Sequence, residues 1–492
     1  MVHRLTTLPW RCEDWRGVRA DEQAGRWSEF LQADRAQGMA LDQAPLMRLA
    51  VIRLEEQRFK FLWTVPALLL DGWSWPLVFR DLSRAYEALC RRQPVALEPA
   101  RPYRDYLAWL RQQSDAETEQ YWRAALRGVT APTQLVAEAP QTPTLRDEQR
   151  AEWRMSLDGP IPDRLVTLAR QLQVTPNTLF QAAWAMVLAR LSGRTDVVFG
   201  AAFAGRPGDL RGSEGIVGPF VNNLPVRVTV DAALSVRSFL QGLHDGLLRL
   251  NPHQFASLAQ IQSWTDVPWR HRLFDSIVVV QNYLVDEAAR RLGNAVAISD
   301  FVGPIHTSFP LLVLVEPESA WRITLVYDPR ELPASAIQRW GKDLVHTLTG
   351  LSENTETKVG TLLGQLSLPV TAAPARRGWR VQSQNYVAPQ TELERRIAGV
   401  WEEMLQLDRI SVEENVFDLG VHSLLAVRLH QRLCEVLGRD FSLVSMFQYP
   451  TIQSLAKLLS QKVGGDRSGE IRNRAQLQRG AVARSRPVSA RR

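Results

Sequence analysis

The chain has 492 residues, of which 45% are hydrophobic and 23% charged, and this composition predicts a globular protein with room for two or three domains. The three cysteines are far apart and none lies in a CxxC pair, which argues against a disulfide framework or a metal site and favours a reducing, cytoplasmic setting. No apolar run is long enough to span a membrane, so we expect no membrane partner.

The first informative stretch is FLWTVPALLLDGWSW at residues 61–75, which predicts a strand, a sharp turn and a helix. Phe61, Leu62, Trp63 and Val65 suit a mostly buried strand, and Asp71-Gly72 supplies the turn. Apolar residues then recur at helical spacing, namely Trp75, Val78, Phe79, Leu82 and Tyr86. Turns of this kind often present chemistry in α/β folds. This one offers only Val, Pro, Ala and Leu before Asp71, and none of these transfers a proton.

Helix and strand patterns alternate up to about residue 350, as expected of an α/β fold. The clearest helix is TPNTLFQAAWAMVLARLSG, with Thr175 as N-cap, Pro176 in the first turn and Gly193 at the end. We expect one apolar face on it, formed by Leu179, Ala183, Val187 and Leu191. A strand is predicted at residues 196–200. The polar, Pro-bearing text around 130–150 predicts a junction between two lobes, and residues 366–389 read as a linker.

A compact helical unit follows this linker. Thr391 and Glu394 have capping-box spacing at the start of its first helix, a second helix begins at Ser423, and a third begins near Pro450 and Thr451. Three helices in so short a stretch predict a small bundle. The segment 464–492 that follows holds eight of the arginines against two acidic residues and no aromatic residue. We interpret it as a solvated linker rather than a nucleic-acid site.

The second of these helices carries the sharpest motif, NVFDLGVHSLLAVRL at residues 415–429. From the residues alone, Ser423 could simply be an N-cap. The motif and its flanks, over about 387–463, resemble the acyl- and peptidyl-carrier signature D-x-F-x-x-L-G-G-x-S-L. The resemblance implies 4′-phosphopantetheine on the hydroxyl of Ser423, with a degenerate carrier as the alternative. Val421 replaces the second glycine of the signature, and we expect this β-branched residue to slow the modification.

The first 350 residues resemble the condensation domains of nonribosomal peptide synthetases. Seven stretches match in order: APLMRLAVIRL (44–54), LLLDGWSWPLVFRDLSRAYEAL (68–89), YRDYLAWL (103–110), QYWRAAL (120–126), DVVFGAAFAGRP (196–207), IVGPFVNNLPVR (216–227) and FDSIVVVQNY (274–283). The resemblance implies an α/β fold of two chloramphenicol-acetyltransferase-like lobes with a tunnel between them. The family's opening motifs, S-x-x-Q-x-R-x-W and R-H-x-x-L-R-T, do not appear, so we expect an incomplete first lobe.

The resemblance also explains the turn without chemistry. The family motif there is H-H-x-x-x-D-G, so Asp71 and Gly72 are retained as structural residues while Pro66 and Ala67 stand where the histidines belong. The second histidine is implied to orient or deprotonate the attacking amine, which Ala67 cannot do. The loss of such a base costs about 10²–10⁴-fold in rate. No confident catalytic residue is left, although His306 could in principle approach the tunnel; a merely exposed or satisfied histidine is the simpler interpretation.

These observations together predict a part of a nonribosomal peptide or hybrid polyketide–peptide synthetase. We expect an incomplete first lobe at 1–150, a second lobe at 151–365, a linker at 366–386, a carrier domain at 387–463 and a basic tail at 464–492. The expected partners are a phosphopantetheinyl transferase, neighbouring synthetase modules and an adenylating enzyme acting in trans. Two alternatives stay open: a non-catalytic platform that recruits a tailoring enzyme, and an acyltransferase that still works through positioning alone.

Overall fold

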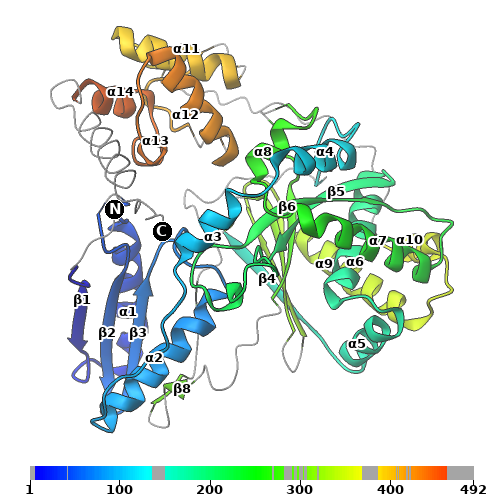
Figure 1. Ribbon diagram of the computed structural model, residues 1–492, viewed down its shortest axis with the longest axis horizontal. Coiled ribbons are helices and arrows are strands. Elements are labelled where there is room, and N and C mark those ends of the chain that lie inside the picture. Colours follow the sequence, from blue (N-terminus) through cyan, green and yellow to red (C-terminus); the bar gives the residue numbers. More distant parts are fainter. Residues whose placement is uncertain are drawn as a thin grey trace, which may run out of the picture. The chain divides into compact units, whose positions relative to one another are not determined.

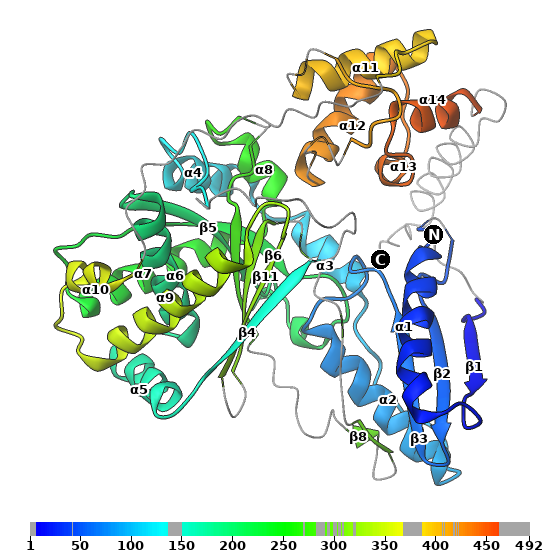
Figure 2. The same cartoon turned by 180° about the vertical axis from the view of Figure 1, so that it is seen from behind.

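The structure, a computed structural model, divides into two compact units, Met1–Pro374 and Ala375–Arg492. It describes residues 6–41, 43–135, 150–268, 271–281, 291–292, 296–298, 303, 307, 309–317, 321–367, 386–405, 407, 409–416, 419, 421 and 423–461. Figure 1 and Figure 2 show the elements of both units from opposite sides.

The first unit begins with a three-stranded sheet in the order β1-β2-β3. β1 (Trp10–Asp14) runs parallel to β2 (Arg48–Glu55), which pairs antiparallel with β3 (Arg58–Thr64). Helix α1 (Ala20–Ala36) packs on one face through a small core that joins Trp15, Ile52 and Leu54 to Trp27 and Phe30. Alternation of side chains along the strands places these core residues on a single face.

Helix α2 (Ser74–Cys90) follows the predicted turn, so the predicted strand and helix are both confirmed. The ring of Trp63 at the end of β3 meets Trp75 of α2 at 4.9 Å between centroids and Phe79 at 6.4 Å. The prediction of a mostly buried strand is wrong for Phe61, which is 44% exposed. Its side chain lies on the face opposite α1, and strand alternation alone does not reveal which face is covered.

The second part of the unit is built on a six-stranded sheet in the order β4-β11-β10-β7-β5-β6. Its central pairs, β10–β7 and β7–β5, are parallel, and the outer pairs are antiparallel. The strands are β4 (Ala151–Leu157), β5 (Asp196–Phe203), β6 (Asn222–Thr229), β7 (Ser276–Val280), β10 (Leu311–Glu316) and β11 (Trp321–Tyr327). A mixed sheet with helices packed on it is the expected α/β arrangement.

Helices α6 (Pro176–Ser192) and α9 (Ala334–Glu353) pack on each other and on this sheet (Figure 2). The other described elements of the first unit are α3 (Tyr103–Leu110), α4 (Asp115–Ala125), α5 (Ile161–Leu172), α7 (Val236–Leu250), α8 (Leu258–Ser263), α10 (Val359–Gln365), the short 3₁₀ turns Ser213–Gly215 and Asn251–His253, and the small hairpin of β8 (Arg291–Leu292) and β9 (Val296–Ala297). β8 contacts α2.

The predicted ends of α6 are confirmed. Thr175 Oγ1 accepts a hydrogen bond from the Thr178 amide at 3.2 Å, and Gly193 ends the helix with a φ of 66°. The expectation of one apolar face is wrong, because fourteen residues of α6 are buried, on all sides of the helix. A helix enclosed by the sheet and by α5, α7 and α9 has no polar face to show.

The second unit contains α11 (Glu392–Leu405), α12 (Ser423–Leu437), α13 (Leu443–Gln448) and α14 (Ile452–Gln461). The prediction of three helices is therefore corrected by one, because the short α13 has too few residues to show a helical period. The capping box is confirmed: the Thr391 amide donates to Glu394 Oε2 at 2.8 Å, and the Glu394 amide donates to Thr391 Oγ1 at 3.2 Å. Trp401 and Leu429 lie fully buried in the centre of this bundle.

Among the described helices of both units, none has the length and apolar character needed to cross a membrane.

Candidate functional site

The segment between β3 and α2 closes as a tight turn in which the Leu69 amide donates to the Pro66 carbonyl at 3.1 Å. Pro66 is half-buried, whereas Ala67 and Leu68 are exposed. The positions of the expected histidines are thus accessible on a well-formed turn. The side chains that occupy them can neither accept nor donate a proton.

Asp71, at the end of this turn, is 8% exposed and bonds to two distant parts of the chain. Its Oδ1 accepts hydrogen bonds from the amide and the hydroxyl of Ser74 at 2.9 and 2.8 Å, at the start of α2. Its Oδ2 accepts from the amides of Phe220 and Val221 at 3.0 and 3.3 Å. The carboxylate therefore joins the turn to the segment that leads into β6.

Arg206 supplies the positive charge opposite Asp71, at 3.4 Å between Nη2 and Oδ1. Its Nη1 donates to the carbonyls of Ser213 and Ile216 at 2.7 and 2.8 Å, and its guanidinium lies 4.1 Å from the centre of the Phe220 ring. Burial lowers the pKa of Arg206, and the charge of Asp71 acts in the opposite direction. We refer to Asp71, Ser74, Arg206, Phe220 and Val221 as the Asp71 network.

Tyr103 of α3 closes the same region. Its hydroxyl donates to the Pro219 carbonyl at 2.8 Å, and burial together with the negative charge of Asp71 raises the pKa of Tyr103. A Cβ atom at Gly218 would lie only 2.2 Å from the Tyr103 ring, so this position requires glycine. The neighbouring Tyr106 is also held neutral, because burial raises its pKa to about 12.

The chemistry that this arrangement can perform is positioning rather than proton transfer. The carboxylate of Asp71 is fully engaged by hydrogen-bond donors, and neither tyrosine ionises near neutral pH. Of the histidines considered from sequence, His253 stacks on Tyr121 at 4.2 Å between ring centres, and burial lowers its pKa. His306 lies outside the described residues.

Removal of the Asp71 carboxylate should be strongly destabilising. Asp71→Ala leaves Arg206 buried without its charge partner and leaves the Phe220 and Val221 amides without an acceptor. Breaking a buried pair in this way costs about 3–5 kcal/mol of unfolding free energy. Urea denaturation monitored by tryptophan fluorescence measures the loss. Asp158→Ala is the matched control at an exposed aspartate, and equal stability of the two variants would refute a structural role for Asp71.

Sequence reasoning recognised Asp71 but not its partners. Arg206, Phe220 and Val221 lie 135 to 150 residues farther along the chain, and no local period connects them. The available signal was the pair of matched stretches GAAFAGRP and IVGPFVNN, which contain these three residues.

The second candidate site is the start of α12, where Ser423 is the first helical residue. The preceding segment is anchored to the start of α14: Asn415 bridges to Thr451, and the Val416 amide donates to the Pro450 carbonyl at 2.8 Å. These contacts fix where α12 begins. The amino end of a helix this long favours a phosphodiester, because its unpaired amides and its dipole attract negative charge.

Val421 packs inside the bundle at 3% exposure. Among the described residues other than glycine, only Arg92 and Gln173 have a positive φ, so the backbone at Val421 does not require glycine. Its effect on the rate of modification stays a prediction. His422, most of the linker and the basic tail lie outside the described residues.

Two protein-family models match the chain. The model of the condensation domain matches residues 1–365, and the model of the phosphopantetheine attachment site matches residues 395–459. Part of the linear gramicidin synthase of Brevibacillus parabrevis is 37% identical over 346 residues, which cover 70% of this chain and 7% of that polypeptide. Chondramide synthase cmdD of Chondromyces crocatus is 34% identical over 358 residues, which cover 72% of this chain and 9% of that protein. The chain thus spans less than a tenth of the length of these two relatives.

Solved structures agree on the fold. The starter condensation domain of rhizomide synthetase RzmA superposes with a TM-score of 0.59 at 21% identity, covering 73% of this chain and 80% of that one. The X-domain from teicoplanin biosynthesis gives 0.59 at 19% identity, with 73% and 82% covered. Holo-AB3403, a four-domain nonribosomal peptide synthetase, gives 0.60 at 18% identity, with 81% and 31% covered. The α/β condensation-domain class with an added carrier bundle is therefore confirmed.

Proposed function

Because the chain belongs to the condensation-domain family of nonribosomal peptide synthetases and carries a phosphopantetheine carrier domain behind it, we propose that its main task is to hold an aminoacyl or peptidyl thioester on Ser423. The cofactor of such a carrier is 4′-phosphopantetheine, which supplies a thiol on a flexible arm. The observation that carries the proposal is the coincidence of Ser423 with the first residue of α12, inside the matched carrier region.

The condensation-like domain is proposed to have lost its own amide-forming chemistry. The turn that should present the proton-handling histidine presents Ala67 instead, and the nearby Asp71 is committed to the Asp71 network. The domain keeps the frame of the site, since the contacts from the turn to Phe220 and Val221 are intact. What remains is the capacity to position bound groups.

The carrier would be loaded and unloaded by other proteins. A phosphopantetheinyl transferase and neighbouring synthetase modules are implied by the carrier domain. We propose further that an adenylating enzyme acts in trans, since the chain has no Gly-rich Ser/Thr loop of the adenylating type. The free thiols of Cys12, Cys90 and Cys434 support a cytoplasmic setting.

The recruitment alternative makes a different demand on the first unit. A platform would bind a tailoring enzyme while the carrier presents its cargo, and it would need no histidine at residue 67. A pull-down with the tailoring enzymes encoded beside this protein distinguishes the two functions. Retention by the full chain, but not by a chain lacking residues 1–365, would favour the platform.

A direct test of the proposed function is a transfer assay with the intact chain. The carrier is charged with an amino acid by means of aminoacyl-coenzyme A and a broad-specificity transferase, and a donor carrier with an acyl thioester is then added. We expect the aminoacyl thioester to persist on the chain without amide formation, as followed by intact-mass spectrometry. Rapid amide formation would contradict the proposed loss of chemistry, and failure to charge would contradict the carrier function.

The proposed domain boundaries, with lobes at 1–150 and 151–365, a linker at 366–386, the carrier at 387–463 and a tail beyond it, predict that the carrier folds alone. A fragment of residues 385–465 contains the capping box and the buried Ile397, Trp401 and Leu455. We expect cooperative thermal unfolding by circular dichroism. Trp401→Ala in the same fragment should lose about 3–5 kcal/mol. A non-cooperative melt of the unmodified fragment would contradict the proposed boundaries.

A further inference from the structure

The three-stranded sheet of the first unit has an apolar face that the described residues leave partly uncovered. Trp10, Phe59 and Phe61 lie on the face opposite α1 and are 54%, 53% and 44% exposed. The rings of Trp10 and Phe61 are 6.4 Å apart, so they form one strip across β1, β2 and β3. Exposed aromatic strips on a soluble sheet commonly mark a contact surface.

β1 also exposes a row of backbone hydrogen-bonding groups. The Leu49 amide donates to the Pro9 carbonyl at 2.9 Å, and the Trp15 amide donates to the Arg53 carbonyl at 2.8 Å, so the odd-numbered residues of β1 face β2. The amides and carbonyls of Trp10, Cys12 and Asp14 consequently point away from the sheet. Among the strands in the described part of the chain, only β2 pairs with β1. An open edge of this kind is a template for another strand.

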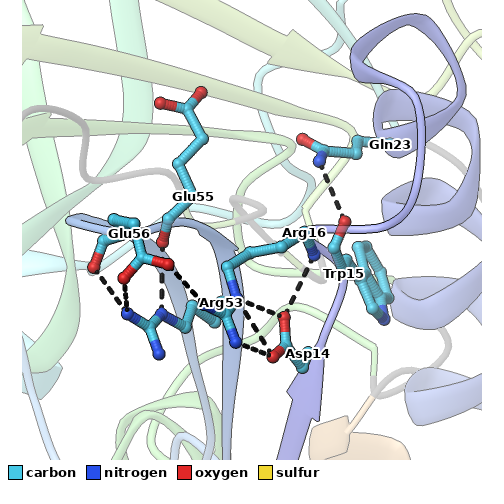
Figure 3. A network of polar contacts seen from close by, with 7 residues as sticks. All are labelled: Asp14, Trp15, Arg16, Gln23, Arg53, Glu55 and Glu56. Carbon is cyan, nitrogen blue, oxygen red and sulfur yellow. Dashed lines mark hydrogen bonds and ion pairs between the residues drawn. The ribbon is translucent and has the colours of Figure 1, made fainter.

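The edge is held in place rather than frayed. Figure 3 shows the polar contacts at the carboxyl end of β1, where Asp14 and Arg16 meet the loop between β2 and β3. Arg16 donates to Asp14 Oδ1 at 3.0 Å and pairs with Glu56, and Arg53 also pairs with Glu56. Hydrogen bonds from Arg16 lower the pKa of Asp14 to about 2, so its carboxylate stays charged in this network. Gln23 of α1 adds a bond to the Trp15 carbonyl (Figure 3).

We propose that β1 pairs antiparallel with β1 of a second copy of the chain, about a twofold axis that passes beside Cys12. This register is self-complementary. Arg11 stands opposite the partner's Glu13, and Glu13 opposite the partner's Arg11, on the face that carries α1. Cys12 stands opposite the partner's Cys12 on the aromatic face. All three outward-pointing residues then exchange backbone hydrogen bonds with the partner strand.

The neighbouring registers are less favourable on the same evidence. A centre at residue 11 or 13 would place arginine against arginine or glutamate against glutamate, and would bring inward-facing backbone groups to the junction. The register centred on Cys12 matches opposite charges, and it also extends the strip of Trp10 and Phe61 across both copies. Charge complementarity and strand parity therefore favour the same occupant, a second copy of this chain.

The first test uses the thiols in the full chain. In a Cys90→Ser/Cys434→Ser background, a short bismaleimide should join two chains through Cys12, because paired Cα atoms in this register lie about 5.5 Å apart. We expect a cross-linked dimer whose peptide map contains two copies of Cys12. A chain that stays monomeric would overturn the proposal. So would a chain that cross-links through Cys12 to a neighbouring synthetase protein instead.

The second test separates the backbone contact from the thiol. Cys12→Ser keeps the outward amide, whereas Cys12→Pro removes it without disturbing the odd-numbered bonds to β2; proline is tolerated on an edge strand. In sedimentation equilibrium we expect the serine variant to dimerise like the unmodified chain and the proline variant to dimerise at least about tenfold more weakly. Equal dimerisation of both variants would overturn the strand pairing.

A charge exchange tests the register itself. Arg11→Glu places like charges opposite each other and should weaken the dimer, and Arg11→Glu/Glu13→Arg should restore it, because the pairs are then only exchanged between the chains. Circular dichroism checks that β1 still folds, since Arg11 also contacts Phe30 and Glu13 contacts Trp15 within one chain. A dimer that is insensitive to Arg11→Glu in a folded chain would contradict the register.

Discussion

Ser423→Ala should abolish the covalent attachment of 4′-phosphopantetheine, whereas the unmodified chain should gain one arm from coenzyme A and a broad-specificity transferase. The substitution removes the oxygen to which the phosphodiester would be attached. It should leave the bundle folded, because the loss of a polar residue at a helix start costs only about 1 kcal/mol. Intact-mass spectrometry of both proteins before and after treatment measures the difference.

The matched control is Ser442→Ala, another serine at a helix start in the same unit. Ser442 is the N-cap residue of α13 and is exposed, so it is accessible to a transferase. We expect the Ser442→Ala variant to be modified as completely as the unmodified sequence. An unmodified parent chain, or an arm that persists on Ser423→Ala, would rule out Ser423 as the attachment site. The sequence-based carrier assignment would then have identified the domain without its site.

Local patterns predicted the elements whose ends are determined by neighbours in sequence. The N-cap at Thr175, the glycine stop at Gly193 and the capping box of Thr391 and Glu394 each involve residues within a few positions of one another. Their physics is complete within one turn of helix, so spacing suffices to find them. The short α13 escaped because six residues are less than two helical turns.

Tertiary context decided what spacing could not. Phe61 and Leu62 are neighbours on one strand, and alternation predicts that they face opposite ways without revealing which side α1 covers. The Asp71 network likewise combines a turn, a helix start and a segment more than a hundred residues away. At the site itself, the sequence alone identified Ala67 in place of a histidine. The structure added that the turn around it is intact and accessible.

Restoring histidine at residue 67 should produce the largest gain in activity that a single substitution can give this chain. The turn is held on the Asp71 network, and Ala67 is exposed, so a histidine there could reach an amine brought by the carrier. A positioned general base contributes about 10²–10⁴-fold to such a reaction. We therefore expect Ala67→His to raise the single-turnover rate of amide formation by about that factor over the unmodified chain, with charged donor and acceptor carriers and mass-spectrometric detection.

A control on the same turn separates a general base in the right place from a histidine merely nearby. Leu68 is 49% exposed and adjacent in sequence, so Leu68→His adds the same imidazole to the same turn in a different direction. We expect no gain from it, while Pro66→His/Ala67→His should at least match the single Ala67→His variant. If Ala67→His and Leu68→His are equally inactive, the missing histidine is not what silences this domain, and the recruitment function gains support. If the unmodified chain already turns over at the rate of Ala67→His, positioning alone suffices and the proposed loss of chemistry is wrong.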